Sequence, residues 1–500
     1  MAKLKITAAG DIQEIEKVSI EERMTAFNTY DMLEQGAAIN PEAPALSFIL
    51  SGDHFASPLR VTYRELLANI RRTANLLRDL GVGPKDVVSY LLPNLPHTHF
   101  NEAAMAFMIA SVAEFYTGET MLCGLPLFHV NGTMVTGGLP FSIGSHVVLL
   151  SPLGYRDPSV MKNFYKIVEH YRAVTFSAVP TVLSVLLDLP KGGADISSLR
   201  YALCGAAPLS IELFQRFEAH TGMKILEGYG LTEGTTASSI NPFHGQRKIG
   251  SIGLRLPYQK MKIRMIDDEG RAVREAKTDG IGAVCISGPN VFGGYLEERH
   301  NRGIWSEPGW LNTGDLGRQD GDGYFWLTGR KKELIIRGGH NIDPAIIEDP
   351  LYRLPGVQTA AAVGRPDPHA GEVPVAYVQL QKGSELTSDR ILEYLQKAVG
   401  ERAAVPKDVF VLDAIPLTPV GKIFKPALRW DAIRRTYEQE LEAVRDAVES
   451  VVVDVSEDRA HGTMANVKIR AKETASREVL ERRVADLLAR YTVRYKVEWV

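Results

Sequence analysis

Short apolar runs alternate with helical stretches between residues 146 and 230, and most of these runs end in a glycine-rich turn. The runs read GSHVVLLSP, AVTFSAVP, RYALCGAAP and KILEGYG, and helical segments at 158–171, near Val182 and at 211–220 lie between them. Such alternation predicts a layered α/β fold, in which ligands usually bind at the turns that follow the strands. No other feature of the chain constrains the fold as strongly.

A further helix is predicted within residues 60–94. Thr62 and Glu65 have the spacing of a capping box, and apolar residues recur at helical intervals from Leu66 to Leu77. Glycines at 81 and 83 end this helix, and VVSYLL is predicted to follow as a buried strand.

The pattern changes to short alternating strands from Ser251 to Phe325, which predicts an antiparallel region that closes a large domain. The charged run RKKE at 330–333 then precedes LIIR and a Gly-Gly turn, as a hinge would. We therefore expect an α/β protein. Its large multi-layer N-terminal domain combines sheets and helices with the antiparallel region, and its smaller C-terminal domain is mobile and of α+β type.

The expected domain boundaries follow from these changes in pattern. Residues 1–333 form the large domain, residues 334–430 the small domain, and residues 431–500 an appended α/β tail. The tail is predicted to begin with a helix whose apolar face carries Ile433, Tyr437, Leu441, Val444 and Val448.

Composition excludes several classes of function. A net charge of -3, from 57 basic and 60 acidic residues, provides no basic field for nucleic acid. Cys123, Cys204 and Cys285 lie 81 residues apart and form no C-x-x-C motif, so they are expected to be small apolar side chains in strands. No run is long enough to span a membrane, and the first twenty residues contain no apolar signal segment. We expect a reduced, cytoplasmic protein.

The stretch Glu227 to Thr235 reads EGYGLTEGT and places three glycines around one threonine and one carboxylate. Its glycines nearly match the G-x-G-x-x-G dinucleotide fingerprint, but the last one comes one residue too late. An NAD-dependent enzyme is therefore not supported. Glu233 has the chemistry of a Mg²⁺ ligand, because this ion takes only one or two protein carboxylates beside phosphate oxygens and water. A solvated acid in a glycine turn is the alternative.

Other motifs are equally ambiguous when each is taken alone. Asp315 in WLNTGDLG suits a ribose diol or a tight turn, and Arg330 suits phosphate, sugar or any surface carboxylate. Lys422 in LTPVGKIFKP is either an exposed lysine or a point charge directed at a developing oxyanion. His129 in LPLFHVNG is either a core histidine or part of a site.

Taken together, the motifs are far more specific. The order LPLFHVNG, CGAAPLS, EGYGLTEGT, WLNTGDLG, GYFWLTGRKKELIIRGGHNIDP and PLTPVGKIFKPALR resembles the adenylate-forming superfamily, and its acyl-CoA synthetase (AMP-dependent synthetase and ligase) branch most of all. The resemblance runs from about Arg60 to Arg429. It implies activation of a carboxylic acid, with a fatty acid as the first expectation, by Mg-ATP. The acyl-adenylate so formed is then attacked by the thiol of coenzyme A.

The resemblance also implies residue roles. Gly205, Ala206, Ala207, Gly228 and Tyr229 would border the adenine, Asp315 and Arg330 would bind the ribose, Thr232 would meet the α-phosphate, and Glu233 would hold Mg²⁺. Lys422 would bridge the substrate carboxylate and the α-phosphate. Glu333 falls at the hinge, where the family usually has aspartate, Gly338, Gly339 and His340 fall on the thioester-side loop, and His129 lines the acyl and coenzyme A side.

One family motif is missing from the sequence. The loop of the form TSGTTGxPK, which wraps the β- and γ-phosphates, belongs between LLPN and LPLFHVNG, but only 28 residues lie between Pro96 and Leu125. These residues are interpreted as a helix and a turn, and the TGET within them has neither the glycines nor the lysine. We infer an internal deletion of roughly one hundred residues, the size of a small domain, which truncates the large domain between about residues 96 and 101.

Two functions remain open at this stage. The first is an AMP-forming acid-thiol ligase whose use of ATP is impaired by the missing loop, because the backbone cradle and lysine that neutralise the outer phosphates are lost. The second is a non-catalytic protein that binds a nucleotide or acyl group. Expected partners are the carboxylic acid, ATP and coenzyme A, without nucleic acid or a transmembrane segment, and the sequence leaves a homo-oligomer open.

Overall fold

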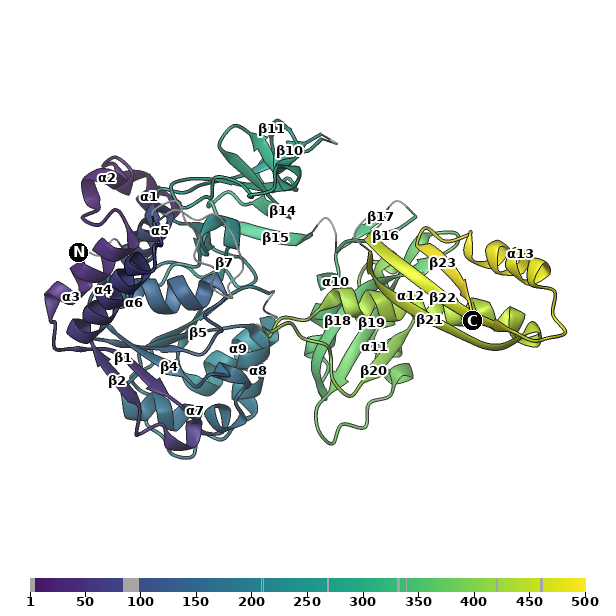
Figure 1. The fold of residues 1–500 in the computed structure, drawn as a ribbon, viewed down its shortest axis with the longest axis horizontal. Coiled ribbons are helices and arrows are strands. Elements are labelled where there is room, and N and C mark those ends of the chain that lie inside the picture. Colours follow the sequence, from purple (N-terminus) through teal and green to yellow (C-terminus); the bar gives the residue numbers. More distant parts are fainter. Residues whose placement is uncertain are drawn as a thin grey trace. The chain divides into compact units, whose positions relative to one another are not determined.

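The computed structural model describes the chain outside residues 1–4, 84–98, 208, 210, 268, 331–332, 339, 420 and 459–461. The chain forms two compact units (Figure 1). The first contains Met1–Thr328 and Pro419–Lys422, and the second contains Gly329–Thr418 and Ile423–Val500. Among the described residues, no helix has the length and apolar character needed to cross a bilayer.

A nine-stranded sheet with the strand order β2-β1-β4-β3-β5-β6-β7-β8-β9 forms the centre of the first unit. The six strands from β1 to β7 in this order are parallel, and β2, β8 and β9 add antiparallel strands at its two edges. Its strands are β1 Pro44–Ile49, β2 Leu59–Thr62, β3 Thr120–Cys123, β4 His146–Leu150, β5 Thr175–Ala178, β6 Tyr201–Cys204, β7 Lys224–Tyr229, β8 Ser239–Ile240 and β9 Leu254–Arg255.

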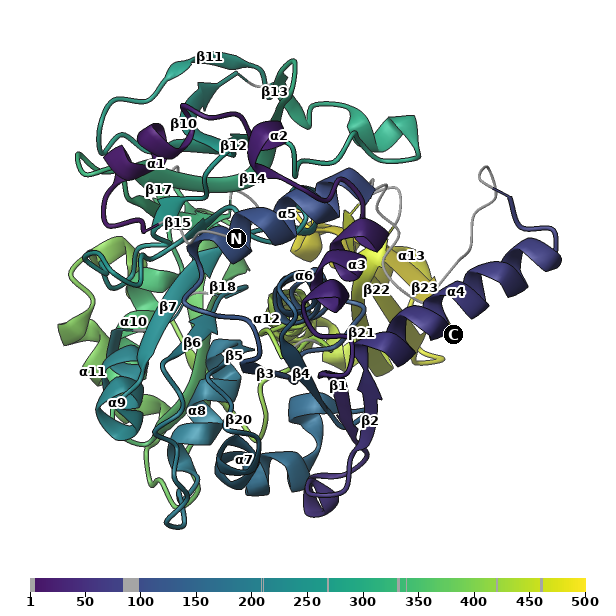
Figure 2. The same ribbon diagram turned by 90° about the vertical axis from the view of Figure 1, so that its left-hand side faces the viewer.

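Helices cover both faces of this sheet (Figure 2). Because side chains alternate along a strand, Leu122 packs in the core under α7, α8 and α9, whereas Met121 packs in the core under α5 and α6. This confirms the predicted layered α/β fold. The helices of the unit are α1 Ala9–Ile15, α2 Ile20–Arg23, α3 Thr29–Ile39, α4 Tyr63–Asp79, α5 His99–Val112, a π-helix Asn131–Gly138, α6 Leu139–Ser142, α7 Pro158–Tyr171, α8 Pro180–Asp188 and α9 Ile211–Thr221.

Local signals at α4 are confirmed. Thr62 and Glu65 form the predicted capping box, and Gly81 adopts φ +86° directly after the helix. The predicted strand VVSYLL, at residues 87–92, lies outside the described residues. The stretch between Pro96 and Leu125 was interpreted as a helix and a turn, which is incomplete, because it also contains strand β3. Strand β3 is only four residues long, and it is ordered by parallel pairing with β4 and β5 that no local pattern reveals.

The antiparallel region predicted after Ser251 is confirmed as a sheet with the order β11-β10-β12-β14-β13, to which β15 is added by pairing with β14. The strands of this sheet are β10 Lys260–Ile266, β11 Ala272–Glu275, β12 Gly282–Ser287, β13 Trp305–Glu307, β14 Trp310–Gln319 and β15 Phe325–Arg330.

All three buried cysteines lie in strands, as predicted, and burial raises the pKa of the Cys123 thiol to about 11.

A five-stranded sheet, β17-β16-β19-β18 with β20 beside β19, forms the first part of the second unit. Its core contains Ile347 of α10 and Ile391 of α11 packed against the sheet. The elements are β16 Ile335–Arg337, β17 His340–Ile342, α10 Ala345–Arg353, β18 Val357–Asp367, β19 Gly371–Leu380, α11 Ser388–Ala398 and β20 Val409–Leu412.

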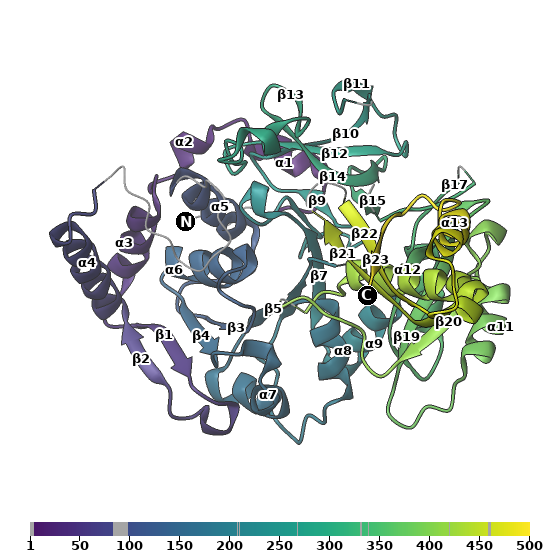
Figure 3. The ribbon, with the colours of Figure 1, turned by 45° about the vertical axis from the view of Figure 1, so that its right-hand side comes forward.

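The last part of the second unit has its own sheet, in the order β21-β22-β23, and its own core (Figure 3). The predicted single helix is wrong at both ends, because α12 begins at Lys425 and ends at Leu441, and Val448 is the first residue of β21. The five apolar residues still share one core, because a 3-10 turn at Glu442–Ala447 leads the chain from helix to sheet. The elements are α12 Lys425–Leu441, β21 Val448–Asp458, β22 Gly462–Ala471, α13 Arg477–Leu488 and β23 Arg494–Trp499.

Candidate functional site

Three predicted site segments lie at one edge of the parallel sheet. His129 follows β3, Gly205 follows β6, and Gly228 and Tyr229 are the last two residues of β7. Thr181, which is not a predicted site residue, follows β5 at the same edge. Because β3, β5, β6 and β7 are parallel, their carboxyl ends share this edge. Ligands of open α/β sheets bind at such an edge.

The turns after β6 and β7 are in direct contact. Cys204 pairs with Glu227, and a Cβ added to Gly205 would lie 2.8 Å from the backbone oxygen of Gly228. Ala206 adopts φ +72°, which is uncommon for a residue with a side chain, and Ala207 follows it. The structure therefore brings Gly205, Ala206 and Ala207 beside Gly228 and Tyr229, the two segments predicted to border the adenine.

The stretch Glu227 to Thr235 folds as the end of β7 followed by a tight reversal. A Cβ at Gly230 would lie 1.4 Å from the backbone oxygen of Thr236, so only glycine fits there. Thr232 and Glu233 lie in a single 3-10 turn, and Thr235 and Thr236 follow with φ +55° and +105°. Such strained conformations are typical of functional turns.

Asp315 lies next to Tyr229, although 86 residues separate them in the chain. The Tyr229 hydroxyl donates a hydrogen bond of 2.5 Å to Asp315 Oδ2, and Asp315 is only 5% exposed. Asp315 belongs to strand β14, and the tight turn of the alternative is present there as an irregularity of the strand, in which Gly314 adopts φ +78° and its amide donates to Asn312 Oδ1 at 3.1 Å. Arg330 ends strand β15 in the second unit, and its side chain lies outside the described part of the structure.

Glu233 is held by a residue that the sequence did not indicate. The Tyr295 hydroxyl donates a 2.5 Å hydrogen bond to Glu233 Oε1, and the Phe292 amide donates to the Glu233 backbone oxygen at 2.8 Å. Burial, together with the charge of Glu233, raises the pKa of Tyr295 well above its usual value. Tyr295 lies in VFGGYLEE, which contains no spacing that points to Glu233.

The carboxylate of Glu233 fits the Mg²⁺ assignment on chemical grounds. It is partly exposed at the ligand edge, and one carboxylate suffices for an ion that completes its shell with phosphate oxygens and water. Within the ranges that the structure covers, no group of three or more His, Cys, Asp or Glu side chains could hold a metal by itself. The site therefore suits a metal that arrives with a nucleotide.

Lys422 and Gly421 belong to the first unit by their contacts. Thr181 Oγ1, at the start of α8, donates to the Gly421 backbone oxygen at 2.8 Å. Burial first, and the charge of Lys422 second, lower the pKa of His129 to about 4. The Asn131 amide donates to His129 Nδ1 at 3.2 Å, which requires that nitrogen to be unprotonated. The structure thus brings Lys422 near His129.

Glu333 has a charged neighbour, Lys425, in the second unit. Its Oε2 lies 3.7 Å from Lys425 Nζ, which is also 2.8 Å from Glu348 Oε1. Burial lowers the pKa of Lys425, but the charges of Glu348 and Glu333 outweigh burial and raise it. Sequence reasoning missed Lys425, although it lies only three residues after Lys422.

The predicted thioester-side loop is the turn between β16 and β17. Arg337 pairs with His340 across it, and Gly338 adopts φ +56° and donates its amide to the Ala370 backbone oxygen at 2.8 Å. His340 is exposed, and Gly339 lies outside the described residues. These residues belong to the second unit and are described only within it.

The TGET segment at residues 117–120 lies on the other edge of the sheet. Its last residue, Thr120, is the first residue of β3, so the segment is at the amino end of a strand whose carboxyl end carries the site. Glu119 accepts hydrogen bonds of 2.6 and 2.5 Å from Arg200, which itself precedes β6. This turn ties two strand beginnings together, and its carboxylate would repel phosphate.

Comparisons with known proteins agree with this arrangement. The model of the AMP-binding enzyme family matches residues 33–113 and 95–296, and that of the AMP-binding enzyme C-terminal domain matches residues 347–422. The chain is 41% identical over 390 residues to the marinolic acid–CoA ligase of Pseudoalteromonas sp. (strain SANK 73390), a match that covers 77% of this chain and 59% of that protein. It is 32% identical over 399 residues to the sulfoacetate–CoA ligase of Cupriavidus necator, covering 79% and 68%.

A solved structure shares the fold. The anthranilate CoA ligase AuaEII, in complex with anthranoyl-AMP, superposes with a TM-score of 0.72 at 20% identity and covers 83% of this chain and 99% of its own. The chain therefore belongs to the family of AMP-binding enzymes, with their large N-terminal and small C-terminal domains. It spans 59% of the length of the marinolic acid–CoA ligase.

Proposed function

We propose that the chain belongs to an acid-thiol ligase that activates a carboxylic acid with ATP and transfers the acyl group to coenzyme A. The observation that carries this proposal is the hydrogen bond between Tyr229 and Asp315, which joins two distant motifs at the ligand edge of the sheet. A buried carboxylate beside a glycine turn suits the two hydroxyls of a ribose next to a base.

The proposed steps assign work to this chain's own residues. The turns at Gly205–Ala207 and Gly228–Tyr229 hold the adenine, and Asp315, assisted by Arg330, accepts the ribose hydroxyls. Thr232 donates its hydroxyl to the α-phosphate, and Lys422 places a cation where negative charge builds as the acid attacks that phosphate. Preorganised charge of this kind contributes about 10²- to 10³-fold in rate for one donor.

The remaining roles belong to the second half-reaction. We propose that Glu333 is the hinge, that Gly338, Gly339 and His340 then contribute to the thioester side, and that His129 lines the acyl and coenzyme A approach.

Mg²⁺, held by Glu233, would neutralise phosphate charge when the nucleotide binds. The boundaries at residues 333 and 430, and a cytoplasmic location, remain predictions of the sequence.

The missing phosphate loop makes impaired use of ATP part of the proposal. The family model matches in two stretches rather than one, and these overlap at residues 95–113, where the deletion is proposed. The acidic TGET turn lies at the wrong edge of the sheet to replace the loop. We propose that the β- and γ-phosphates lack the backbone cradle and lysine that neutralise them.

A second candidate is a protein that binds a nucleotide or acyl group without turnover. The same TGET geometry favours it, because Tyr229 and Asp315, both assigned to adenosine, are in contact, while the carboxylate of the TGET turn is paired with Arg200. In this case AMP would be the preferred nucleotide. Lys422 and Glu233 would then be remnants of catalysis.

Calorimetric titration with AMP and with Mg-ATP tests both candidates. We expect AMP to bind and Mg-ATP to bind no more than about threefold more tightly, because added phosphates gain little without a cradle. A chain that binds neither nucleotide refutes the ligase and the nucleotide-binding form of the second candidate. Rapid acid-dependent exchange of pyrophosphate into ATP would refute the impairment.

A screen for coenzyme A thioesters assigns activity and acid together. Fatty and aromatic acids are compared, because apolar segments near His129 and at residues 177–185 suit an aliphatic chain but also an ordinary core. Product that disappears in Lys422→Ala supports the ligase. AMP binding with no thioester from any acid supports the non-catalytic alternative.

A further inference from the structure

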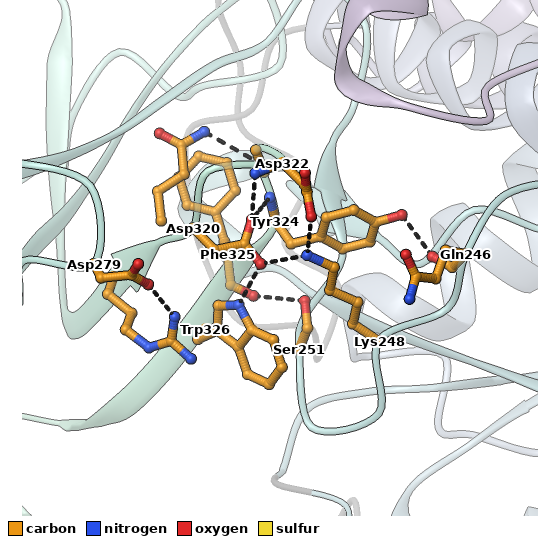
Figure 4. Close-up of polar contacts among 12 residues, drawn as sticks. Gln246, Lys248, Ser251, Asp279, Asp320, Asp322, Tyr324, Phe325 and Trp326 are labelled. Carbon is orange, nitrogen blue, oxygen red and sulfur yellow. Dashed lines mark hydrogen bonds and ion pairs between the residues drawn. The ribbon is translucent and has the colours of Figure 1, made fainter.

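Lys248 lies in a network that the proposed chemistry does not use. It belongs to the segment between β8 and β9, and its Nζ is 2.7 Å from both Asp320 Oδ2 and Asp322 Oδ2 (Figure 4). The same ammonium lies 4.5 Å from the centre of the Tyr324 ring. These three partners form the turn of the β14–β15 hairpin, the hairpin that carries Asp315.

Asp320 is the central acceptor of this network. Its Oδ1 accepts from the backbone amides of Asp322 at 3.0 Å and Tyr324 at 2.9 Å, and its Oδ2 accepts from Trp326 Nε1 at 3.1 Å. Burial alone would raise the pKa of Asp320, but the bonds from Lys248, Tyr324 and Trp326 lower it. The side chains of Lys248 and Asp320 are 17% and 13% exposed, whereas Asp322 is 74% exposed. The Lys248–Asp320 pair is therefore less exposed to solvent than the Lys248–Asp322 pair.

The backbone of Lys248 is fixed to strand β7. The Lys248 amide donates to Asn241 Oδ1 at 3.0 Å, and the buried Asn241 donates its own amide to the Glu227 backbone oxygen at 2.9 Å. Asn241 Nδ2 also donates to the backbone oxygen of Ser251 at 2.6 Å, and Ser251 Oγ donates to that of Phe325 at 2.8 Å. Glu227 directly precedes Gly228 and Tyr229, so the network begins where the proposed adenine turn begins.

The β14–β15 hairpin is thus attached to β7 at two separated points. One is Tyr229 to Asp315, and the other runs from Glu227 through Asn241 and Lys248 to Asp320. Asp320 comes five residues after Asp315, a span of about 16 Å along an extended chain. Backbone pairing of β14 with β12 and of Phe325 with Gly253 holds the hairpin in its sheet, and the Tyr229 and Lys248 contacts fix the two ends of the segment that carries the Asp315 carboxylate. Binding groups must be held to within about 0.5 Å to act well.

We infer that Lys248 is a positioning residue that aims Asp315 at the ribose of a bound nucleotide. The inference rests on the proposed adenosine site. It makes a claim that a general stabilising role does not make: loss of the Lys248 ammonium should weaken the contacts to the ribose hydroxyls more than the contacts to the base. Ribose discrimination is therefore the quantity to measure.

The experiment compares AMP with 2′,3′-dideoxy-AMP by calorimetry on the full chain. The unaltered protein should prefer AMP on the order of 10²-fold, because each hydrogen bond to a charged acceptor contributes roughly tenfold. Lys248→Met keeps the aliphatic stem over Tyr324 and removes the charge. We expect it to lose about tenfold of the preference while its affinity for the dideoxy nucleotide stays within about twofold.

Two variants serve as controls. Arg318→Met removes a cation from β14, the strand that carries Asp315, and it should keep the full preference, because Arg318 pairs with Asp279 and stacks over Trp326. Lys248→Arg keeps a cation between the two carboxylates and should restore most of it. If Lys248→Met does not fold, Asp322→Asn is used instead, because Asp322 is the exposed partner of Lys248. Its preference for AMP over the dideoxy nucleotide should fall about twofold.

The outcomes separate the two levels of the argument. Equal losses for both nucleotides in Lys248→Met, or an unchanged preference, would overturn the positioning role and leave the adenosine site standing. An unaltered protein that binds the two nucleotides equally would instead refute the adenosine site, and the inference with it.

Discussion

The two edges of the parallel sheet differ sharply. At the carboxyl edge, the turn after β6 meets Gly228 of β7, and the Tyr229 hydroxyl donates to the buried carboxylate of Asp315. At the amino edge, the TGET turn binds Arg200 through Glu119 and serves the sheet itself. The difference teaches that the residues proposed for the base and ribose form a structure of their own, which does not depend on the turns at the amino edge. The outer phosphates of a nucleotide need a cradle of backbone amides and a cation. This cradle is a different part of the protein, so a chain can lose it without losing the turns at the carboxyl edge.

The largest effect should come from a substitution that breaks the carboxyl edge. Gly230→Ala places a Cβ 1.4 Å from the Thr236 backbone oxygen. The reversal must then rearrange, so we expect a loss of about 3 kcal/mol or more in the free energy of unfolding and no measurable AMP binding. Urea unfolding followed by circular dichroism, together with calorimetry, measures both quantities.

A matched glycine tests whether this result is specific. Gly10 lies in helix α1 with no atom within 4 Å of an added Cβ, so Gly10→Ala should keep AMP binding and gain roughly 0.5–1 kcal/mol. Normal AMP binding by Gly230→Ala would show that the adenosine contacts lie elsewhere.

The second effect concerns the amino edge alone. Glu119→Gln leaves the partly buried Arg200 without its charged partner, and we expect a loss of about 2 kcal/mol in the free energy of unfolding. AMP affinity should stay within about twofold, because this edge is remote from the ligand turns. A tenfold change in the affinity for AMP or Mg-ATP would contradict the separation of the two edges.

A pair of hydroxyl deletions sharpens the comparison within the carboxyl edge. Tyr229→Phe removes the donor to Asp315 and should weaken AMP binding about tenfold. Tyr295→Phe removes the donor to Glu233, so it should leave AMP affinity unchanged and weaken binding of Mn²⁺, used as a probe for Mg²⁺, in the presence of nucleotide. Each variant is the control for the other, and identical effects of both would rule out separate ribose and metal subsites.

The smallest effect is a dependence of stability on pH. The folded pKa of His129 is about 4, below the value near 6.5 of an unfolded histidine, so the unfolded chain binds more protons between these values. Stability should therefore rise with pH across this window, and lowering the pH from 7 to 6 should cost less than about 1 kcal/mol. His129→Asn should flatten the unfolding profile over pH 4–6.5, whereas the exposed His300→Asn should not. An unchanged slope in His129→Asn would exclude this histidine as the source.

Much of the fold could be predicted from local patterns. The capping box at Thr62 and Glu65, the glycine-ended strands and the antiparallel strands after Ser251 depend on neighbours in the chain. The errors have a common cause. Strand β3 depends on pairing with β4 and β5, and α12 ends at Leu441 because the appended sheet needs a turn there, so both depend on partners that are distant in sequence.

The site divides in the same way. The sequence identified Gly228, Thr232, Glu233, Asp315 and Lys422 through their motifs, and their roles in binding and catalysis remain predictions. It did not identify Tyr295, Lys425 or Lys248, because a tyrosine or lysine without a motif looks like any other. Only their contacts with Glu233, Glu333 and Asp320 distinguish them.

The sequence by itself determined the family, the layered α/β class and the residue types available for adenosine, because these depend on spacing along the chain. Tertiary structure alone decided which of those residues meet. In a parallel sheet, the turns that follow the strands lie at one edge and the segments that precede the strands lie at the other, so the turns proposed for adenosine and the TGET segment are at opposite edges. Tertiary structure also brings Tyr229 into contact with Asp315, 86 residues away in the chain.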